Sequence, residues 1–234
     1  MKINCDIGER GANQTDIELI KLIDIANIAC GGHAGDADTV KLFRDLAAKY
    51  NVEVSAHLSY PDRKNFGRVS MDIDSSVLKD SLTLQYSLLS DIKTVKLHGA
   101  LYNDCWFDEE LSRTVVSWFI ESGISSVIAP DNSVLAAYCR EYGIDVIREA
   151  FAERRYNFDT ESRQLSLVSR KHPRASIDNC QQAIEQYEEI RSGSVTAFTD
   201  SSQRTCIQKI FTDTVCIHSD SQIALQLARC LKDV

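Results

Sequence analysis

The chain lacks any long hydrophobic run, because no apolar stretch in its 234 residues approaches the roughly 20 that a membrane-spanning helix requires. It also lacks a basic surface signature: 34 Asp and Glu outnumber 26 Lys and Arg, and no basic cluster interleaves with aromatic residues. We therefore expect no membrane segment and no nucleic-acid partner. The first residues, 1–6, indicate a strand and contain no apolar signal-peptide core, which predicts a cytoplasmic protein.

Several sequence motifs are missing as well. No Cys-x-x-Cys occurs among the eight cysteines, which predicts reduced, mostly buried thiols in place of a disulfide framework. Neither Gly-x-x-x-x-Gly-Lys-[Ser/Thr] nor Gly-x-Gly-x-x-Gly is present, so any use of ATP would depend on another subunit. The absence of Gly-x-Ser-x-Gly argues against a serine-nucleophile hydrolase.

What the chain does contain is an alternation of strand-like and helix-like hydrophobic periods. The predicted strands are 2–6, 25–30, 52–57, 94–98, 125–129, 145–151 and 213–218, and the predicted helices are 38–49, 75–89, 108–121, 133–142, 177–190 and 221–231. Such alternation specifies a mostly parallel sheet covered by helices. Polar residues follow nearly every strand, which favours a closed α/β barrel over an open sheet, because all strand ends of a barrel meet at one mouth.

The predicted organisation is a single domain over 1–234 with two irregular segments. Residues 157–174 place polar residues between apolar runs and predict a hairpin or flap insertion. The Ser/Thr-rich stretch 192–202 interrupts the rhythm again and contains a candidate short strand at 195–198.

Two carboxylates follow the first predicted strand. Asp6 and Glu9 are separated by Ile7-Gly8, and Gly8 allows a sharp turn that directs both acids to the same side. In such a pair, one carboxyl group can act as an acid while the other acts as a base or a ligand. Acidic decoration of a helix N-terminus is the alternative interpretation.

Four of the five histidines lie at strand ends, and three of them, His33, His57 and His98, follow successive strands. A lone strand-end histidine is more often a satisfied core residue. Three at one rim indicate proton transfer or metal binding. Asp6, His33 and His57 are the candidate ligands of a divalent metal, and the pattern leaves both the presence and the identity of that metal open.

Two later segments add candidate groups. Asn103 and the backbone at Gly99 could hold a developing oxyanion beside His98, and a packed turn with a polar lid is the alternative. Arg154 presents a planar fork of donors suited to a carboxylate, although it could equally pair with Glu153.

These residues recur in seven ordered blocks, which span residues 4–220. The blocks are Asn4-Cys-Asp6-x-Gly8-Glu9, Ala26-Asn-Ile-Ala-Cys-Gly-x-His-Ala-Gly-Asp36, Ala56-His57 with Tyr60-Pro-Asp62, Phe66-Gly-Arg68, Val95-Lys-x-His-Gly-Ala-Leu-Tyr-Asn103, Phe151-Ala-x-Arg154 with Tyr156, and Val215-Cys-Ile-His218-x-Asp220. Together they resemble the LamB/YcsF family, understood as the A component of the bacterial 5-oxoprolinase. Seven blocks in order are far more specific than any single motif.

The resemblance implies an irregular (β/α)7-type barrel of the glycoside hydrolase/deacetylase kind that opens 5-oxoproline (pyroglutamate) to L-glutamate. Subunits B and C are the implied partners, and they would activate the lactam with ATP while this chain completes the ring opening with water. Homo-oligomerisation is left open. The expected catalytic residues are Asp6, Glu9, His33, His57 and His98. The expected substrate-binding residues are Asn4, Tyr60, Arg68, Lys96, Asn103, Glu153, Arg154, His218 and Asp220.

The chain departs from the usual family pattern at a few positions. Leu58-Ser59 replace Pro-Gly, Leu97 replaces a proline, Glu153 an aspartate and Ser219 a glycine. Serine tolerates positive φ less well than glycine, so we expect the loop after His57 to run differently. Glu153 reaches one methylene further, which would move its carboxylate by about an ångström. These changes indicate a divergent member whose substrate can differ.

Three functional hypotheses follow. In the first, Asp6 or Glu9 activates water, His57 and His98 move protons and steady the oxyanion, and Arg154 or Lys96 holds the carboxylate of 5-oxoproline. The second is a metal-dependent deacetylase of a carbohydrate or amino-acid conjugate. The third is a non-catalytic subunit that binds a small carboxylate.

Overall fold

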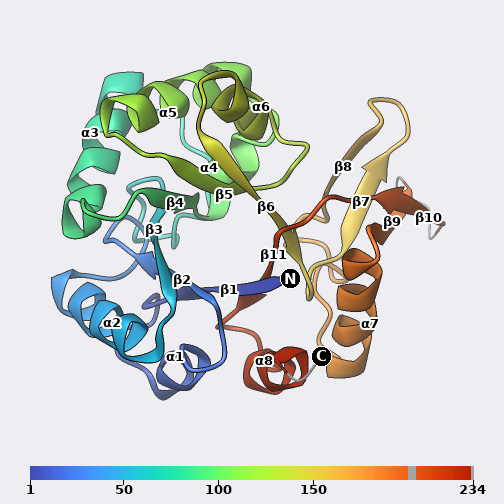
Figure 1. The fold of residues 1–234 in the computed structure, drawn as a ribbon. Helices are drawn as coiled ribbons and strands as arrows, with labels where there is room; N and C mark the ends of the chain where they lie inside the picture. The colour runs from blue at the N-terminus through green and yellow to red at the C-terminus, as the bar shows by residue number, and fades with distance from the viewer. Residues whose placement is uncertain (200–203, 233–234) are drawn as a thin grey trace.

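The computed structural model describes residues 1–199 and 204–232. Within these residues, seven parallel strands close into a barrel in the order β1-β11-β6-β5-β4-β3-β2 (Figure 1). The barrel strands are β1 (Lys2–Ile7), β2 (Ile25–Ala29), β3 (Glu53–Leu58), β4 (Thr94–Leu97), β5 (Ser126–Ala129), β6 (Asp145–Phe151) and β11 (Thr214–His218). The predicted α/β barrel is confirmed, and each predicted strand agrees with the observed one to within one residue at either end.

Most of the barrel strands are buried along most of their length, as expected for a parallel sheet that is enclosed by helices. All five residues of β2 are buried, and so is all of β1 after Lys2. Register is continuous around the barrel. For example, Asp6 of β1 aligns with Asn27 of β2 and with His218 of β11. Because all seven strands run the same way, their C-terminal ends lie at one end of the barrel.

Helices cover the outside of the barrel, except for one that lies beside a second, smaller sheet (Figure 1). They are α1 (Gln14–Leu19), α2 (Ala37–Tyr50), α3 (Ser75–Tyr86) with the 3-10 turn η1 (Ser87–Leu89), α4 (Gly99–Asp104), α5 (Glu109–Glu121), α6 (Val134–Glu141), α7 (Cys180–Arg191) and α8 (Ala224–Lys232). Side-chain caps define several helix starts. Asp36 forms a capping box with Thr39 at the start of α2. Among the described residues, no helix is both long and apolar enough to cross a membrane.

A four-stranded sheet beside the barrel contains the region where the sequence rhythm is interrupted. Its order is β10-β9-β7-β8, with β7 (Tyr156–Asp159), β8 (Gln164–Leu167), β9 (Ser194–Thr199) and β10 (Thr205–Lys209). β7 and β8 form an antiparallel hairpin that begins one residue before the 157–174 segment, and α7 packs against β9. Residues 200–202 of the irregular stretch 192–202 lie outside the described residues.

Three short elements have no counterpart among the predicted ones. α1 and α4 have only six residues each, too few to show a hydrophobic period. β10 alternates exposed and half-buried side chains at one edge of the small sheet, and Ile207 is 76% exposed. Two observed helix starts differ from the predicted ones. α7 begins at Cys180 and α8 at Ala224, each three residues later than predicted.

Candidate active site

The candidate active site lies at the C-terminal ends of β1 to β4, where the turns after these strands direct polar side chains inward. Gly8 has a φ of +80°, in the left-handed region that favours glycine, and this turn separates Asp6 from Glu9. His33 lies in the loop after β2 and His57 near the end of β3. His98 directly follows β4 as the N-terminal flanking residue of α4.

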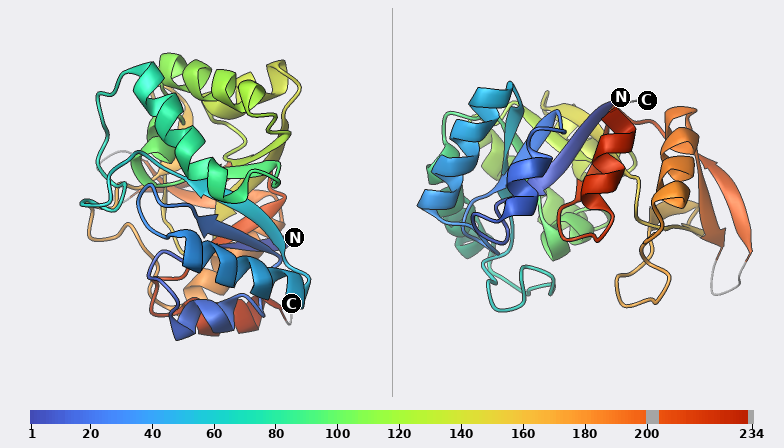
Figure 2. Two further views of the ribbon diagram at one scale, coloured as in Figure 1. Left: turned by 90° about the vertical axis from the view of Figure 1, so that its left-hand side faces the viewer. Right: turned by 90° about the horizontal axis from the view of Figure 1, so that it is seen from below.

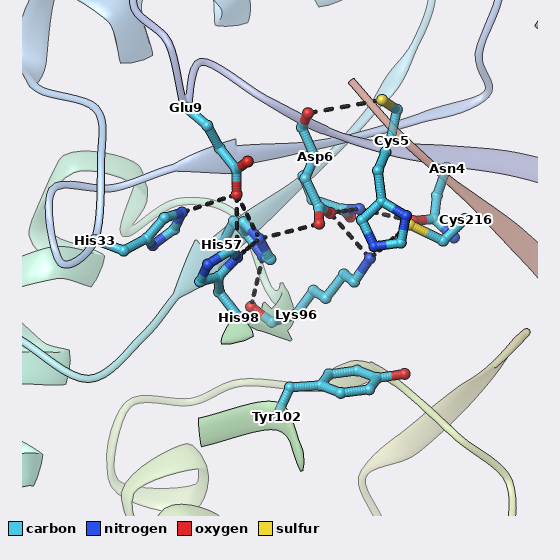
Figure 3. Close-up of polar contacts among 12 residues, drawn as sticks. Asn4, Cys5, Asp6, Glu9, His33, His57, Lys96, His98, Tyr102 and Cys216 are labelled. Carbon is cyan, nitrogen blue, oxygen red and sulfur yellow. Dashed lines mark hydrogen bonds and ion pairs between the residues drawn. The ribbon is translucent and has the colours of Figure 1, made fainter. Parts of the chain in front are cut away.

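Glu9 is surrounded by three imidazoles (Figure 3). Its Oε1 atom lies 3.0 Å from His33 Nε2, 3.0 Å from His98 Nδ1 and 3.5 Å from His57 Nε2. The Glu9 side chain is 7% exposed, and the His33 and His98 rings stack with their centroids 3.7 Å apart. The predicted convergence of Glu9 with these three histidines is therefore present in the fold.

The two histidines of β3 and β4 also contact each other. His57 Nε2 lies 3.0 Å from His98 Nδ1. The remaining ring nitrogens face backbone carbonyls, with His57 Nδ1 at 3.3 Å from the Lys96 oxygen and His98 Nε2 at 3.0 Å from the Phe66 oxygen. Because a carbonyl only accepts, these contacts place a proton on His57 Nδ1 and on His98 Nε2.

Asp6 connects this cluster to a second set of buried charges. Its Oδ2 lies 3.3 Å from His57 Nε2, and its Oδ1 accepts hydrogen bonds from Lys96 Nζ at 2.9 Å and from Asn27 Nδ2 at 2.9 Å. The Lys96 ammonium also pairs with Glu149 Oε1 at 2.7 Å. Lys96 is 2% exposed, so its positive charge is balanced by these two carboxylates inside the barrel.

The local charges shift the pKa of the acidic groups. Burial alone would raise the pKa of Asp6, but the charges of His57 and Lys96 hold it well below its usual value. Burial also opposes ionisation of Glu9, and its polar contacts with the rings of His33, His57 and His98 nevertheless hold its pKa well below the usual range. Both carboxylates are therefore ionised at neutral pH.

The imidazoles respond in opposite directions to the same environment. Burial lowers the pKa of His57, but the negative charges of Asp6 and Glu9 outweigh it and raise the pKa to about 9. Burial, together with the neighbouring charge of His98, lowers the pKa of His33 to about 3. Burial also lowers the pKa of His98 despite the presence of Glu9. A proton in this cluster therefore resides preferentially on His57.

A cleft opens to solvent beside the cluster, and it is lined by Asp6, Glu9, Lys96 and His98 together with Arg154. The Arg154 guanidinium is buried and donates to the carbonyl oxygens of Val168 at 2.7 Å and Ala175 at 3.3 Å. Within the described residues, no carboxylate forms an ion pair with it. Burial and the nearby charge of Arg170 lower its pKa to about 10, so it stays cationic at neutral pH.

The other expected substrate-binding residues have varied positions. Asn103 and His218 line the same cleft, and Arg68 lines it while pairing with Asp220 at 2.9 Å. Glu153 accepts a hydrogen bond from the backbone N–H of His218 and lies 3.2 Å from its Nδ1. The Arg154–Glu153 ion pair considered above does not form.

Two expected residues face elsewhere. The Tyr60 hydroxyl donates to Asp104 Oδ2 at 3.0 Å, beside a different groove that includes Ser70 and Met71. Asn4 lies deeper in the barrel, where its Oδ1 accepts from Asn27 Nδ2 at 2.8 Å and from Lys96 Nζ at 3.2 Å. Asn4 therefore orients Asn27 and Lys96, which in turn contact Asp6.

Sequence reasoning missed several contributors to the site. Asn27 and Glu149 contact Asp6 and Lys96 from β2 and β6, and the Tyr102 hydroxyl donates to Glu149 at 2.7 Å. The sequence signal that could have identified Asn27 is its position as a polar residue inside an otherwise apolar strand. Arg170 lines the cleft from the loop after β8, and nothing in its local sequence indicated that position.

Ser59, one of the residues that depart from the family pattern, lies directly after β3. Among the described residues, the non-glycine positions with positive φ are Asn51, Phe66 and Arg163, so Ser59 carries no strain of this kind. Its backbone is held by Gln85 of α3, whose side chain accepts from the Ser59 N–H at 3.0 Å and donates to the Ser59 carbonyl at 2.9 Å.

Two sets of side chains in the described part of the chain have ligand atoms close enough to hold a metal ion. Glu9, His33, His57 and His98 form one set, and Asp6, Cys216 and His218 form the other. In each set, the ligand atoms lie within 4.8 Å of one another. The first set has the nitrogen and oxygen donors that Zn²⁺ and related divalent cations accept, so these residues fit such an ion.

The whole sequence, residues 1–234, matches the model of the LamB/YcsF family. The chain belongs to the LamB/YcsF family. This LamB/YcsF protein is also similar to the crystal structure of a lactam utilization protein from Thermus thermophilus. The two are 27% identical with a TM-score of 0.83, and the match covers 100% of this chain and 94% of the other. The resemblance inferred from seven sequence blocks is thereby confirmed.

Proposed function

We propose that this protein opens the cyclic amide of 5-oxoproline to L-glutamate as the A component of an ATP-dependent 5-oxoprolinase, together with subunits B and C. The observation that carries the proposal is the meeting of Asp6, Glu9 and His98 at one solvent-open cleft that also contains Arg154, with the buried His57 in contact with all three. Family membership and the similarity to a lactam utilization protein support a cyclic amide as the substrate.

Arg154 binds the substrate carboxylate. Its guanidinium is buried at the cleft wall, and it keeps donors for a bidentate contact because its described partners are only two backbone carbonyls. Lys96 is less suitable for this role, since Asp6 and Glu149 already share its ammonium. The substrate ring is then directed toward the carboxylates and imidazoles at the ends of β1, β3 and β4.

Ring opening adds water across the amide C–N bond. An ionised carboxylate, Asp6 or Glu9, accepts a proton from the water as its oxygen bonds to the amide carbon. His57 holds a proton at neutral pH and is placed to transfer it, through His98, to the ring nitrogen as the C–N bond breaks. The products are the second carboxyl group and the amino group of glutamate.

The partner subunits supply the activation step in this proposal. The sequence contains no phosphate-binding loop, and an unstrained amide is a poor electrophile at neutral pH. Phosphoryl transfer from ATP to the lactam oxygen on subunits B and C would make the ring carbon more electrophilic. Water addition and C–N cleavage then give an acyl phosphate with a free amino group, and hydrolysis of the acyl phosphate by a second water releases phosphate and completes the carboxyl group of glutamate. The division of labour leaves this chain with positioning and proton transfer.

Reconstitution tests the proposal. A purified mixture of this chain with B and C subunits should release glutamate and phosphate from 5-oxoproline and ATP. Asp6→Asn should reduce glutamate release by at least about 100-fold, in the range typical of a lost general base. Asp45→Asn, an exposed aspartate of α2 paired with Lys41, is the matched control and should keep the wild-type rate. Full activity of Asp6→Asn would remove this carboxylate from its role, and binding of 5-oxoproline without turnover would favour a non-catalytic subunit.

A second candidate function is a metal-dependent deacetylase, which the set Glu9, His33, His57 and His98 favours because its donors suit a catalytic divalent cation. Such an ion would lower the pKa of a bound water toward about 7 and so supply a nucleophile without ATP. Deacetylation of model N-acetyl substrates without ATP or partners, abolished by chelators, would support this function over ring opening.

A further inference from the structure

The contacts among Glu9, His57 and His98 are incompatible with every arrangement of protons on the two rings when Glu9 is ionised. The outer nitrogens, His57 Nδ1 and His98 Nε2, donate to the carbonyls of Lys96 and Phe66. In neutral rings, the inner nitrogens therefore carry lone pairs, yet His57 Nε2 and His98 Nδ1 lie 3.0 Å apart. Two lone pairs at this distance repel each other unless a positive charge lies between them.

Adding protons does not resolve all of the contacts. If His57 alone takes a second proton, the lone pair of His98 Nδ1 still faces the ionised Glu9 Oε1 at 3.0 Å. If His98 alone takes a second proton, the lone pair of His57 Nε2 faces the carboxylates of Asp6 at 3.3 Å and Glu9 at 3.5 Å. If both rings take a second proton, two N–H groups point at each other across 3.0 Å. One cation bound by all three atoms satisfies both contacts with neutral imidazoles and an ionised carboxylate.

The spacing of the three atoms is close to that of the ligands around one metal ion. Nitrogen and oxygen ligands of tetrahedral Zn²⁺ lie about 2.0–2.2 Å from the ion, which separates neighbouring ligands by about 3.3–3.5 Å. The three separations among Glu9 Oε1, His57 Nε2 and His98 Nδ1 are 3.0, 3.0 and 3.5 Å. The outer nitrogens also have the carbonyl partners that fix the tautomer and orientation of metal-binding histidines.

We propose that Glu9, His57 and His98 bind one divalent cation of the zinc type and leave a further coordination position open toward the cleft. His33 is a positioning residue in this site. Its Nε2 lies 3.0 Å from Glu9 Oε1, and its Nδ1 has no hydrogen-bond partner among the described residues. No carbonyl therefore fixes a lone pair on Nε2, and a neutral His33 can donate its Nε2 proton to hold Glu9 in place.

The ligand set differs from the triad of Asp6, His33 and His57 that the sequence suggested. Lys96 and Asn27 already donate hydrogen bonds to Asp6 Oδ1, which keeps this oxygen out of the ligand set. The other carboxylate oxygen, Oδ2, remains available as a base beside the ion. The inference does not depend on the proposed function, because a chain that binds the cation but does not open 5-oxoproline would still have this site. The proton transfer by His57 and His98 described above belongs to the chain without the ion, since both rings are neutral ligands when the ion is bound.

Direct binding to the chelator-treated chain tests the inference. Titration calorimetry with ZnCl2 should give one site per chain, and Zn²⁺ should raise the Tm of the wild-type protein. Co²⁺ in place of Zn²⁺ should give a visible absorption band that reports imidazole and carboxylate ligation. His57→Ala, His98→Ala and Glu9→Gln should each weaken Zn²⁺ binding by at least about 100-fold, beyond the effect typical of a group outside the ligand set.

Control variants separate this site from the alternatives. His172→Ala removes an exposed imidazole on the loop after β8 and should keep the wild-type affinity. His33→Gln retains an N–H donor for Glu9 and should weaken binding by no more than about 10-fold, whereas His33→Ala should weaken it further. Circular dichroism of each variant checks that it is folded. Absence of Zn²⁺ binding by the wild type, wild-type affinity in both His57→Ala and His98→Ala, or loss of binding only in His218→Ala would each overturn the inference.

Discussion

Replacing Lys96 by methionine tests the buried charges beneath the active site. The Lys96 ammonium lies 2.9 Å from Asp6 and 2.7 Å from Glu149, and the residue is 2% exposed. Burial alone would lower the pKa of Lys96, but the carboxylates of Asp6 and Glu149 raise it well above its usual value, so the group is charged. Lys96→Met keeps the length of the side chain and leaves two buried carboxylates without their cation.

The expected loss is large on the scale of protein stability. Breaking a buried ion pair by removing one partner typically costs about 3–5 kcal/mol, because the remaining charge is uncompensated. For a chain of this size, each kcal/mol lowers Tm by about 2–4 °C, so the variant should melt about 6–20 °C below the wild type. Urea unfolding followed by circular dichroism measures the change in the free energy of unfolding directly.

A double-mutant cycle assigns the loss to the charges. Glu149→Gln keeps an acceptor for the Tyr102 hydroxyl and removes one negative charge, so Lys96→Met with Glu149→Gln should be less destabilised than the sum of the two single variants. Lys41→Met, which removes an exposed partner of Asp45, should change stability by less than about 1 kcal/mol. A loss below about 1 kcal/mol for Lys96→Met, or strict additivity in the cycle, would refute the reasoning.

Three further predictions concern the substrate cleft, the barrel wall and the turn at α4. Arg154→Gln should lower kcat/KM for 5-oxoproline by about 10- to 100-fold, mainly through KM, as steady-state kinetics of the reconstituted complex would show; an unchanged KM would place the carboxylate elsewhere. The Arg148 side chain lowers the pKa of Asp213, so this pair stabilises the fold above the unfolded pKa of about 3.9 and loses its contribution as pH falls through the folded value. Because both side chains are over a third exposed, Asp213→Asn should cost no more than about 1 kcal/mol at pH 7 and less at pH 3; a cost that grows with acidity would contradict this. Gly99→Ala should lose about 1–3 kcal/mol in thermal unfolding, because φ is +59° and a Cβ would meet the Gly67 carbonyl oxygen at 2.3 Å, and wild-type stability would show that this turn is not constrained.

The barrel was predictable because its strands are short apolar runs that recur with helical segments between them. β2 is buried along its whole length, so its sequence, Ile-Ala-Asn-Ile-Ala, carries a strong hydrophobic signal. The small sheet was harder to foresee. β10 lies at a sheet edge with alternate residues exposed, and β9 pairs with the distant β7, which no local pattern records.

The sequence predicted which residues form the candidate site better than it predicted which of them contact one another. Asp6 and His57 lie near the ends of β1 and β3, and His98 directly follows β4. Because β3 neighbours β4 and is separated from β1 only by β2, the convergence of these residues follows from the fold. Which atom meets which depends on turn geometry and rotamers. Glu9, and not Asp6, therefore became the centre of the three imidazoles, and Lys96 turned inward to Asp6 and Glu149.

Long-range contacts account for what the sequence did not indicate. Tyr60 lies only three residues after His57, but its hydroxyl meets Asp104 on the far side of that loop. Arg170 reaches the cleft from the loop after β8, and Arg68 reaches it from the loop after β3. The two loops extend from the same end of the molecule in the right-hand view of Figure 2. Such meetings depend on loop paths that residue spacing does not determine.

The most direct test of the central claim is a crystal structure of the chain soaked with 5-oxoproline. The account predicts the substrate carboxylate on the Arg154 guanidinium and the lactam carbonyl turned toward Asp6, Glu9 and the two imidazoles of His57 and His98. Binding of 5-oxoproline in a different groove, or with its lactam bond facing away from these four residues, would contradict it.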